Sequence, residues 1–334
     1  MIVVDAMGGD HAPAEICRGA VQACRQNPNL EIALVGKGEL LGPLLDEAAS
    51  GERKRLHIVP AEEVIAMDET PAVAIRKKRK ASLCVAMHMV RSGEAQGCVS
   101  AGNTGAIVAG GVLIVGRIPG IDRPGLGVPL PTQKRMSLLL DVGGTIRCKP
   151  LNLYQFALMG EVYMRSIWGV KEPEIALLSN GEEEIKGDDV VAEARELIRQ
   201  GGHRFVGYVE GKDIPVGLAD VVVTDGFTGN ILLKFAEGVG RAAYDIVREE
   251  MGHRLLPRVG VLFLWPMLRS LWHRFDYERY GGTPLLGVSG AVIKAHGRSK
   301  APAIENAIKV AQNFVDQGGV HRIRDEIVRR GDQA

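Results

Sequence analysis

Short apolar runs that end in glycine-containing turns recur along this chain and constrain its fold more than any other feature. Runs such as Ile2–Val4, Leu56–Val59 and Gly97–Ser100 alternate with longer stretches of helical spacing such as Ala14–Arg25 and Leu151–Trp168. A strand that is apolar on both faces must be covered on both faces, so the alternation predicts a mainly parallel sheet between two layers of helices. We therefore expect a three-layer α/β/α fold.

The same pattern places the remaining elements and the domain limits. Further strands are expected at Glu31–Val35, Met136–Val142, Glu174–Leu178, Phe205–Val209, Ala219–Val223 and Gly287–Ile293. Further helices are expected at Pro71–Val90, Ala106–Val115, Asp188–Arg199 and Ala301–Asp316, and from the DGFTGN turn to about Glu250. Because no repeat or polar linker divides the chain, residues 1–334 are expected to form a single α/β domain, with two lobes on a continuous sheet as the alternative.

Composition disfavours several classes of protein. The 41 Lys and Arg residues nearly balance the 40 Asp and Glu residues, which disfavours a nucleic-acid-binding protein. The five cysteines are odd in number and form no CxxC motif. This disfavours a disulfide framework and a structural zinc site, and favours a reducing cytoplasm. Asp5 comes too early for the apolar region of a signal peptide.

Two apolar stretches bear on membrane contact. Ala95–Gly116 has 22 residues without a charge, enough to span a bilayer, but its glycines and polar residues favour a strand, a turn and a helix. Arg254–Tyr280 mixes Trp265 and Trp272 with arginines, as an interfacial helix does. We expect an apolar helical tip at about 251–280 that contacts the membrane; a dimer or core helix is the alternative. The residues expected at the membrane are Leu262, Phe263, Leu264 and Trp265.

Four polar, glycine-containing loops follow apolar strands, at residues 7–13, 100–105, 179–187 and 225–230. Ligands of open α/β sheets gather at the carboxyl ends of the strands, so these loops are expected to meet at one edge. Free N–H groups at the start of the following helices bind anions. Neither a Walker A motif nor GxGxxG after the first strand is present, which disfavours a nucleotide ligand. The alternative is that each loop is only a tight turn.

The chain resembles the phosphate acyltransferase (PlsX) family in a series of motifs that runs from residue 1 to about residue 308. The motifs are MIVVDAMGGDHAP, ETPAVAIRKK, VSAGNTGA, DRPGLGVPLPT, NGEEEIKG, ADVVVTDGFTGN and YGGTPLLGVSGAVIKAHG. Each alone is weak, but together and in this order they are highly specific. The resemblance implies a fold similar to phosphotransacetylases and the isopropylmalate-dehydrogenase group.

The resemblance also implies an activity and partners. A long acyl chain would pass from acyl carrier protein to inorganic phosphate, and the acyl phosphate would feed the first acylation of glycerol 3-phosphate, by a downstream glycerol-3-phosphate acyltransferase, in bacterial phospholipid synthesis. It implies a homodimer in the cytoplasm, partly peripheral on the inner face of the cell membrane, with no cofactor and no metal. This chain departs from the family at two places. After Asp141 the family usually reads GAN and this chain reads Gly143-Gly144-Thr145; before the glycine of NGEEEIKG the family usually has Asn-Ile and this chain has Ser179-Asn180. Both places lie in expected site loops and bear on the contacts of the site.

The reaction needs positioning more than proton removal, because phosphate is already anionic near neutral pH. The thioester carbonyl needs an oxyanion stabiliser, and a thiolate leaving group benefits from a nearby cation. Lys186 is the leading catalytic candidate, since the matching family lysine is thought to be an active-site residue; a solvated loop lysine is the alternative. Asn230 is the second, as a donor to a carbonyl or phosphate, with a helix N-cap as the alternative.

Other polar residues of the loops are expected to bind phosphate or substrate, with helix capping or structural hydrogen bonding as the alternative. They are Asp10, His11, Ser100, Asn103, Thr104 and Thr228. Cys98 raises an acyl-cysteine route, which is disfavoured because a cysteine in an apolar strand is usually a small buried hydrophobe. The carboxylates of Glu182–Glu184 are adjacent and cannot converge on one metal ion unaided, so a solvated loop is favoured there.

A run of cations lies on the expected helix after residue 71. Acyl carrier proteins are acidic and dock on basic patches, so this run is the expected docking site, with a solvated helix face as the alternative. The run comprises Arg76, Lys77, Lys78, Arg79 and Lys80. Two other functions stay open: a short-chain phosphotransacetylase that uses acyl-coenzyme A, and a non-catalytic scaffold that holds acyl carrier protein near the membrane.

Overall fold

The computed structural model describes the chain except for residues 182, 184–185, 253–263, 265–266, 268–280 and 332–334. Its strands form one eleven-stranded sheet in the order β3-β2-β1-β4-β11-β10-β5-β6-β9-β7-β8. The strands are β1 (Ile2–Asp5), β2 (Ile32–Gly36), β3 (Leu56–Pro60), β4 (Gly97–Ser100), β5 (Gly125–Pro131), β6 (Met136–Leu140), β7 (Ile175–Leu178), β8 (Phe205–Val209), β9 (Val221–Val223), β10 (Thr283–Leu286) and β11 (Ala291–Lys294).

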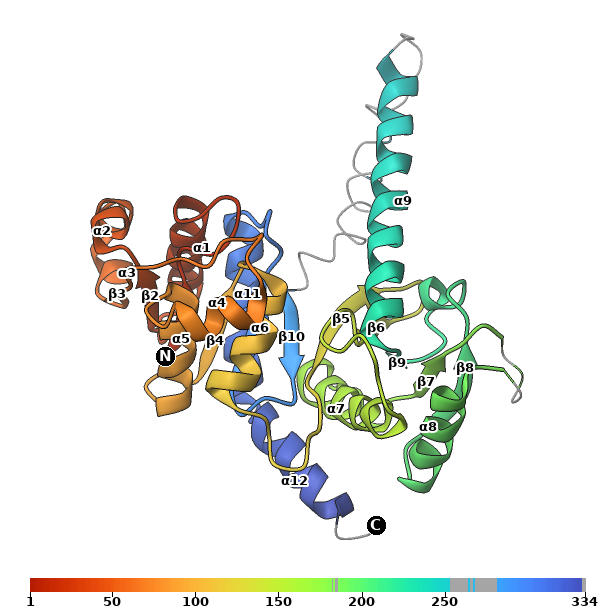
Figure 1. Cartoon of the computed structure of the whole chain (residues 1–334). Coiled ribbons are helices and arrows are strands. Elements are labelled where there is room, and N and C mark those ends of the chain that lie inside the picture. Colours follow the sequence, from red (N-terminus) through yellow and green to blue (C-terminus); the bar gives the residue numbers. More distant parts are fainter. Residues whose placement is uncertain (182, 184–185, 253–263, 265–266, 268–280, 332–334) are drawn as a thin grey trace.

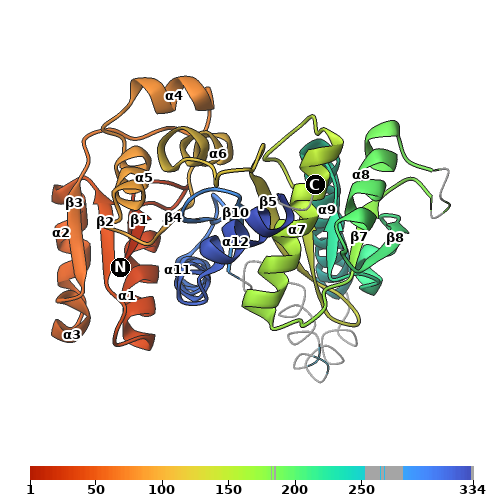
Figure 2. The same ribbon diagram turned by 90° about the horizontal axis from the view of Figure 1, so that it is seen from below.

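Helices cover both faces of this sheet, as Figure 2 shows from below. They are α1 (Ala14–Gln26), α2 (Gly38–Asp46), α3 (Ser50–Arg53), α4 (Pro71–Lys77), α5 (Ser82–Ser92), α6 (Thr104–Gly110), α7 (Pro150–Trp168), α8 (Asp189–Gln200), α9 (Gly226–Gly252), α11 (Ala301–Asp316) and α12 (Gly319–Gly331). A π-helical turn, Gly111–Val115, continues α6, and Ile214–Val216 form a 3-10 turn. The three-layer α/β/α prediction is confirmed.

Alternation of side chains along the strands builds the layers. Ile2 and Val4 of β1 point to one face, where they pack in a cluster with Ile16 of α1 and Ile304 of α11. Val3 points to the other face and packs in a cluster with Met87 of α5. Because successive side chains of a strand point to opposite faces, an all-apolar strand needs a helix on each side. Burial on both faces is therefore what places the helices.

The direction of the strands reverses in the middle of the sheet. β3, β2, β1, β4 and β11 run parallel to one another, and β6, β9, β7 and β8 also run parallel to one another. Between these groups β10 pairs antiparallel with β11 and with β5, and β5 pairs antiparallel with β6. The two parallel groups consequently point in opposite directions. The single-domain assignment of residues 1–334 stays a prediction.

The expected helix over Pro71–Val90 is wrong in one respect, because the chain forms two helices there. α4 ends at Lys77, and Lys78 leaves the helical region with φ −96° and ψ 65°. The Lys78 ammonium donates to the Val64 carbonyl at 2.9 Å and to Glu69 at 2.6 Å. These tertiary partners break the helix within the basic run.

The expected strand at Gly287–Ile293 is correct only from Ala291, where β11 begins, because residues 287–290 form the turn that links β10 to β11. Gly287 adopts φ +93°, a conformation that favours glycine, and the chain then returns as β11 to pair with β10. β5 was not expected at all, because its sequence GLGVPLP carries two prolines, which argue against a central strand. α12 was not expected either.

α9 stands away from the body of the molecule over most of its length (Figure 1). Its first turn is held against the loop after β6, where the Gly226 N–H donates to the Thr145 carbonyl at 2.8 Å. A Cβ atom on Gly229 would lie 1.9 Å from the Asp141 carbonyl oxygen. Glycine is therefore required at position 229 for α9 to begin where it does.

We predict that Gly229→Ala costs about 1–3 kcal/mol of stability, because the methyl group must displace α9 or the loop after β6. Gly240→Ala is the matched control: Gly240 lies inside α9 with no atom within 4 Å of an added Cβ, so alanine there should stabilise by up to about 1 kcal/mol. Urea unfolding of both variants checks this. Equal stability of Gly229→Ala and wild type would contradict the close contact.

Candidate active site

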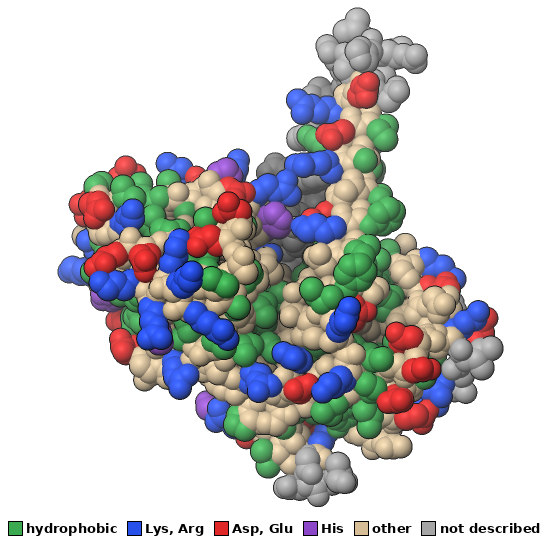
Figure 3. All heavy atoms as spheres, in the orientation of Figure 1, with side chains coloured by type: hydrophobic (Ala, Val, Ile, Leu, Met, Phe, Trp, Pro, Cys, Tyr) green, Lys and Arg blue, Asp and Glu red, His purple; other side chains and the backbone are tan. Residues whose placement is uncertain are grey.

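A cleft with about 740 Å³ of empty space, partly open to solvent, lies over the antiparallel strands at the centre of the sheet. One of its walls is apolar and consists of Leu126, Val128, Pro129, Val142 and Leu233. The polar groups of the cleft are Thr104, Thr283, Asn230, Lys234, Glu237, Lys294, His296 and Ser299. In Figure 3 basic side chains gather in the hollow beside α9. The cleft thus joins an apolar surface to a positively charged end.

Two lysines face one another in the basic end. Lys294 is the last residue of β11 and Lys234 lies in the third turn of α9. Burial lowers the pKa of the Lys294 ammonium, the charge of Lys234 lowers that pKa further, and Glu237 partly offsets both. Glu237 pairs with Lys234 at 3.0 Å, whereas no ion pair to Lys294 is present among the described residues.

His296 follows Lys294 by two residues, and its ring is held in one orientation. The Arg298 N–H donates to Nδ1 of His296 at 3.2 Å, which assigns the proton of the neutral imidazole to Nε2. Burial, followed by the charge of Lys294, lowers the pKa of His296. The neutral ring therefore predominates near pH 7 and offers Nε2–H as a donor.

β11 fixes the position of these basic groups. Its backbone is paired on both sides, with Lys294 opposite Ser100 of β4 and opposite Thr283 of β10. Beyond the strand, the Ala295 N–H donates to the Ser100 carbonyl at 2.8 Å, and the Ser299 N–H donates to the His296 carbonyl at 2.9 Å. Groups built on a doubly paired strand and a closed turn are held more firmly than groups on a free loop.

The buried carboxylate of Asp141 holds the loop after β6 beneath the start of α9. It accepts from the N–H groups of Leu126 at 2.8 Å, Gly144 at 2.9 Å and Thr145 at 2.6 Å. Burial raises the pKa of Asp141 to about 6, although these hydrogen bonds oppose the rise. Thr145 makes its contacts to Asp141 and Gly226 through its backbone, which any residue could supply. Its departure from the family pattern leaves this framework intact.

Asn230 lines the cleft. The residue that caps the start of α9 is Asp225. The Asp225 carboxylate accepts from the N–H groups of Phe227 and Thr228, each at 2.9 Å. The Thr228 hydroxyl also donates to Asp225, at 2.6 Å, so its hydrogen is engaged at the start of α9. The N-cap alternative for Asn230 is therefore wrong.

Among the residues of the loop after β4, Thr104 lines the cleft, whereas Ser100 and Asn103 are engaged in the framework. The Ser100 hydroxyl donates to the buried Asp5 carboxylate at 2.7 Å. The Asn103 amide donates to the carbonyls of Met67 at 2.9 Å and Glu69 at 3.2 Å, and its oxygen accepts from the Ala106 N–H at 3.0 Å. Asn103 therefore caps the start of α6, as the alternative to substrate binding expected, and its amide hydrogens already have partners.

Asp10 and His11 are exposed and are not among the residues that line the cleft. The Asp10 N–H donates to the Gly297 carbonyl at 2.8 Å. This bond ties the loop after β1 to the turn that carries His296. The substrate-binding roles of Asp10 and His11 stay predictions.

The expectation that the four polar loops share one edge is wrong. The loops after β1 and β4 lie at the carboxyl ends of the first parallel group, and the loops after β7 and β9 lie at the carboxyl ends of the oppositely directed group. Lys186, in the loop after β7, is exposed and does not line the cleft. Its catalytic role stays a prediction. Ser179 is the first residue of the same loop, and Glu182 and Glu184 lie outside the described residues.

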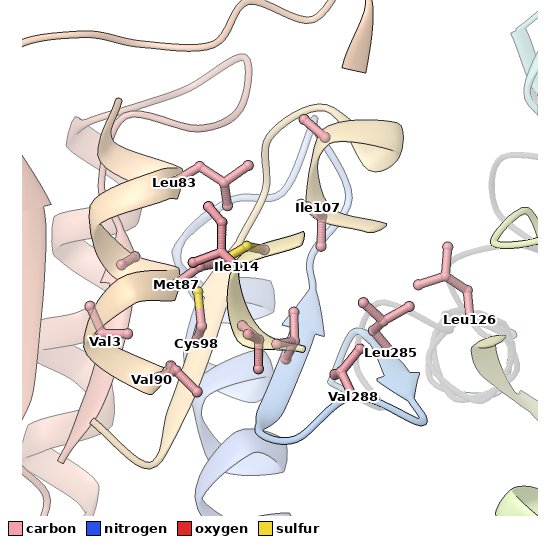
Figure 4. Packing of buried hydrophobic residues seen from close by; sticks show 14 of the residues in the cluster. Val3, Leu83, Met87, Val90, Cys98, Ile107, Ile114, Leu126, Leu285 and Val288 are labelled. Atoms are coloured by element: carbon pink, nitrogen blue, oxygen red, sulfur yellow. The ribbon is translucent and has the colours of Figure 1, made fainter. Parts of the chain in front are cut away.

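Cys98 is fully buried in the apolar layer between β4 and α5. Figure 4 shows it among Val3, Met87 and Val90, and burial strongly raises the pKa of its thiol. A thiol needs exposure and a low pKa to act as a nucleophile. The structure therefore gives Cys98 a packing role, in agreement with the sequence argument against an acyl-cysteine.

The basic run at the end of α4 divides into two kinds of residue. Lys78 and Lys80 pair with Glu69 at 2.6 Å and with Glu62 at 3.0 Å. Arg76, Lys77 and Arg79 are exposed, and no ion pair involves them in the part of the chain that the structure describes. These three side chains remain available to an acidic partner.

Of the residues expected at the membrane, Leu262, Phe263 and Trp265 lie outside the described residues. Leu264 is helical, and half of it is exposed. Within the described residues, no helix has both the length and the apolar character that a membrane crossing needs. The same residues contain no group of three His, Cys, Asp or Glu side chains placed to hold a metal ion.

Sequence reasoning missed the residues of the basic end, which are Lys234, Lys294, His296 and Ser299. Three of them follow the apolar run of β11 in the segment Lys294-Ala-His-Gly-Arg-Ser. This segment has the same character as the four loops singled out, a polar stretch with glycine after an apolar strand. Applying that rule once more would have found it.

Known proteins resemble this chain over nearly its whole length. A family model described as a fatty acid synthesis protein matches residues 1–322. A phosphate acyltransferase from Heliobacterium modesticaldum is 49% identical over 326 residues, which cover 98% of this chain and 97% of that protein.

Two solved structures share the fold at low identity. A phosphotransacetylase from Streptococcus pyogenes matches with a TM-score of 0.67 and 18% identity, over 95% of this chain and 94% of that one. A putative 4-hydroxythreonine-4-phosphate dehydrogenase from Salmonella typhimurium matches with a TM-score of 0.51 and 16% identity, over 94% and 99% of the two chains. These likenesses confirm the expected fold kinship and concern the fold alone.

Proposed function

The chain belongs to the phosphate acyltransferase family, and on that premise we propose that it transfers a long-chain fatty acyl group from acyl carrier protein to inorganic phosphate. A member of this family is an enzyme that transfers an acyl group to phosphate. The observation that carries the finer proposal is the cleft over β5 and β10, where an apolar wall meets a basic end. An acyl phosphate has the same two halves, an aliphatic chain and an anion.

The transfer is proposed to be a direct displacement. An oxygen of hydrogen phosphate attacks the thioester carbonyl carbon, and the carbonyl electrons move onto oxygen. When the tetrahedral oxyanion collapses, the carbon–sulfur bond breaks and the phosphate proton passes to the sulfur, which leaves acyl phosphate and free thiol. Donors aimed at the oxyanion lower this barrier most, and Asn230 and Thr104 lie in the cleft to supply them. The burial of Cys98 supports a route without an acyl-enzyme.

The acyl donor is proposed to be acyl carrier protein rather than coenzyme A. Acyl carrier proteins are acidic, and an exposed basic patch steers and orients such a partner. Arg76, Lys77 and Arg79 supply that patch at the end of α4. α4 begins beside the cleft, because a Cβ on Gly105, next to Thr104, would lie 2.4 Å from the Pro71 ring.

The protein is proposed to work as a homodimer joined through α9. Large apolar side chains recur every fourth residue along the first half of this helix and continue beyond it, and an exposed apolar stripe of this length on a helix marks an interface. They are Phe227, Ile231, Phe235, Val239 and Ile246. A second copy of the same helix would cover this stripe.

Peripheral contact with the inner face of the cell membrane is proposed as well. It rests on the mixture of apolar and cationic residues in Arg254–Tyr280 and on the exposure of Leu264. The acyl phosphate would then be released near a glycerol-3-phosphate acyltransferase, the enzyme class that must consume it. A cytoplasmic enzyme that touches the membrane fits both a carrier-protein substrate and a lipid-like product.

We predict that purified protein, palmitoyl-acyl carrier protein and phosphate yield acyl phosphate, trapped as hydroxamate by hydroxylamine. A parallel reaction with acetyl-coenzyme A should yield little, because the apolar wall and the docking patch are then unused. Product from acetyl-coenzyme A alone would establish the short-chain phosphotransacetylase instead. No product from either donor, with the protein folded, would favour the scaffold.

We also predict that the combined variant Arg76→Glu, Lys77→Glu, Arg79→Glu raises KM for palmitoyl-acyl carrier protein about five- to tenfold at low ionic strength, where surface charges act most strongly. The KM for phosphate should not change. Lys54→Glu, an exposed lysine beside the outermost strand β3, is the control with unchanged KM. An unaltered KM in the combined variant would remove the docking patch from the proposal.

A further inference from the structure

The basic end of the cleft contains an ammonium group, that of Lys294, to which the described part of the chain supplies no counter-charge of its own. Glu237 lies within pairing distance of Lys234, at 3.0 Å, and Lys294 has no ion pair within the described residues. Burying a cation beside a second cation is unfavourable unless an anion completes the group. Such an arrangement in a cleft indicates a bound anion rather than a contribution to stability.

We propose that inorganic phosphate, and then the phosphoryl end of the acyl phosphate, is held between Lys294 and Lys234, with the Nε2–H of His296 as a further donor. This inference rests on the proposed function and assigns its anion site to β11 and α9 rather than to the Lys186 loop. Lys294 and His296 sit at the carboxyl end of β11, and Lys234 approaches from α9.

The arrangement of the cleft supports a site for a small, doubly charged anion. Two ammonium groups donate charge-assisted hydrogen bonds to phosphate, and with Glu237 paired to Lys234 the three side chains still carry a net positive charge. A neutral imidazole donor adds direction without adding a third positive charge. The Ser299 side chain is buried beside them, and the apolar wall formed by Leu126 and Val142 begins next to this group. An anion seated there would leave its acyl partner on the apolar side.

The site also explains the difference between the two lysines. Lys234 pairs with Glu237 before an anion arrives, so its position is fixed along α9. Lys294 is fixed instead by the backbone pairing of β11 on both sides. Both cations are therefore positioned in advance, and phosphate needs little rearrangement to bind.

The test measures binding of inorganic phosphate to the full-length protein by calorimetry, without an acyl donor. Lys294→Met is expected to weaken phosphate binding about ten- to a hundredfold, while the melting temperature without phosphate stays equal or rises, because an unfavourable buried charge is removed. Lys234→Met provides a second variant with the same expected loss. Lys54→Met is the control that keeps wild-type binding.

Lys186→Met separates the two candidate sites. Wild-type phosphate affinity in Lys294→Met and Lys234→Met, with the loss confined to Lys186→Met, would overturn the inference and move the anion site to the loop after β7. Unaltered phosphate binding in all three variants of an enzyme that forms acyl phosphate would also overturn it, while the proposed function stands. Failure of the wild-type protein both to bind phosphate and to form acyl phosphate would overturn the proposed function and this inference together.

Discussion

The reversal of strand direction at the centre of the sheet is the constraint on which the rest of this structure depends. β10 and β5 join two parallel groups that point in opposite directions. Helices that follow strands of the two groups therefore approach the central strands from opposite edges, and α6 and α9 both reach the cleft there. A uniformly parallel sheet would gather its loops at one edge; this sheet places its cleft over its own middle.

Each group of strands is organised around a buried carboxylate at the end of a strand. Asp5 ends β1 and accepts from Ser100 at 2.7 Å, while Asp141 follows β6 and accepts from backbone N–H groups of its own loop and of Leu126. Burial raises the pKa of both carboxyls. Because each of these buried carboxylates accepts several hydrogen bonds from the surrounding loops, it holds those loops in place. The positively charged groups of the cleft are left to face the ligand.

Local sequence patterns predict much of the fold and only part of the site. Helices α1, α7 and α11 lie within a residue or so of the predicted ranges, because their amphipathic spacing and their end signals agree. β5 escaped prediction because of its two prolines, which lie beyond the residues that pair with β10 and therefore have a partner strand on one side only, β6. The direction of a strand depends on pairing with strands that are far away in the sequence. Local patterns therefore led to the wrong expectation that the four polar loops lie at one edge of the sheet. Asn230 and Thr104 were anticipated from their loops, whereas Lys234 carried no signal of its own within a long helix.

The most direct test of the account is a crystal structure with a long-chain β-ketophosphonate, in which a CH2 group replaces the bridging oxygen of acyl phosphate. The account predicts the phosphonate between Lys234 and Lys294, with the aliphatic chain leaving along Leu126, Val128 and Val142. A phosphonate bound at the loop of Lys186, with the central cleft empty, would contradict the claim that the middle of the sheet is the reaction site.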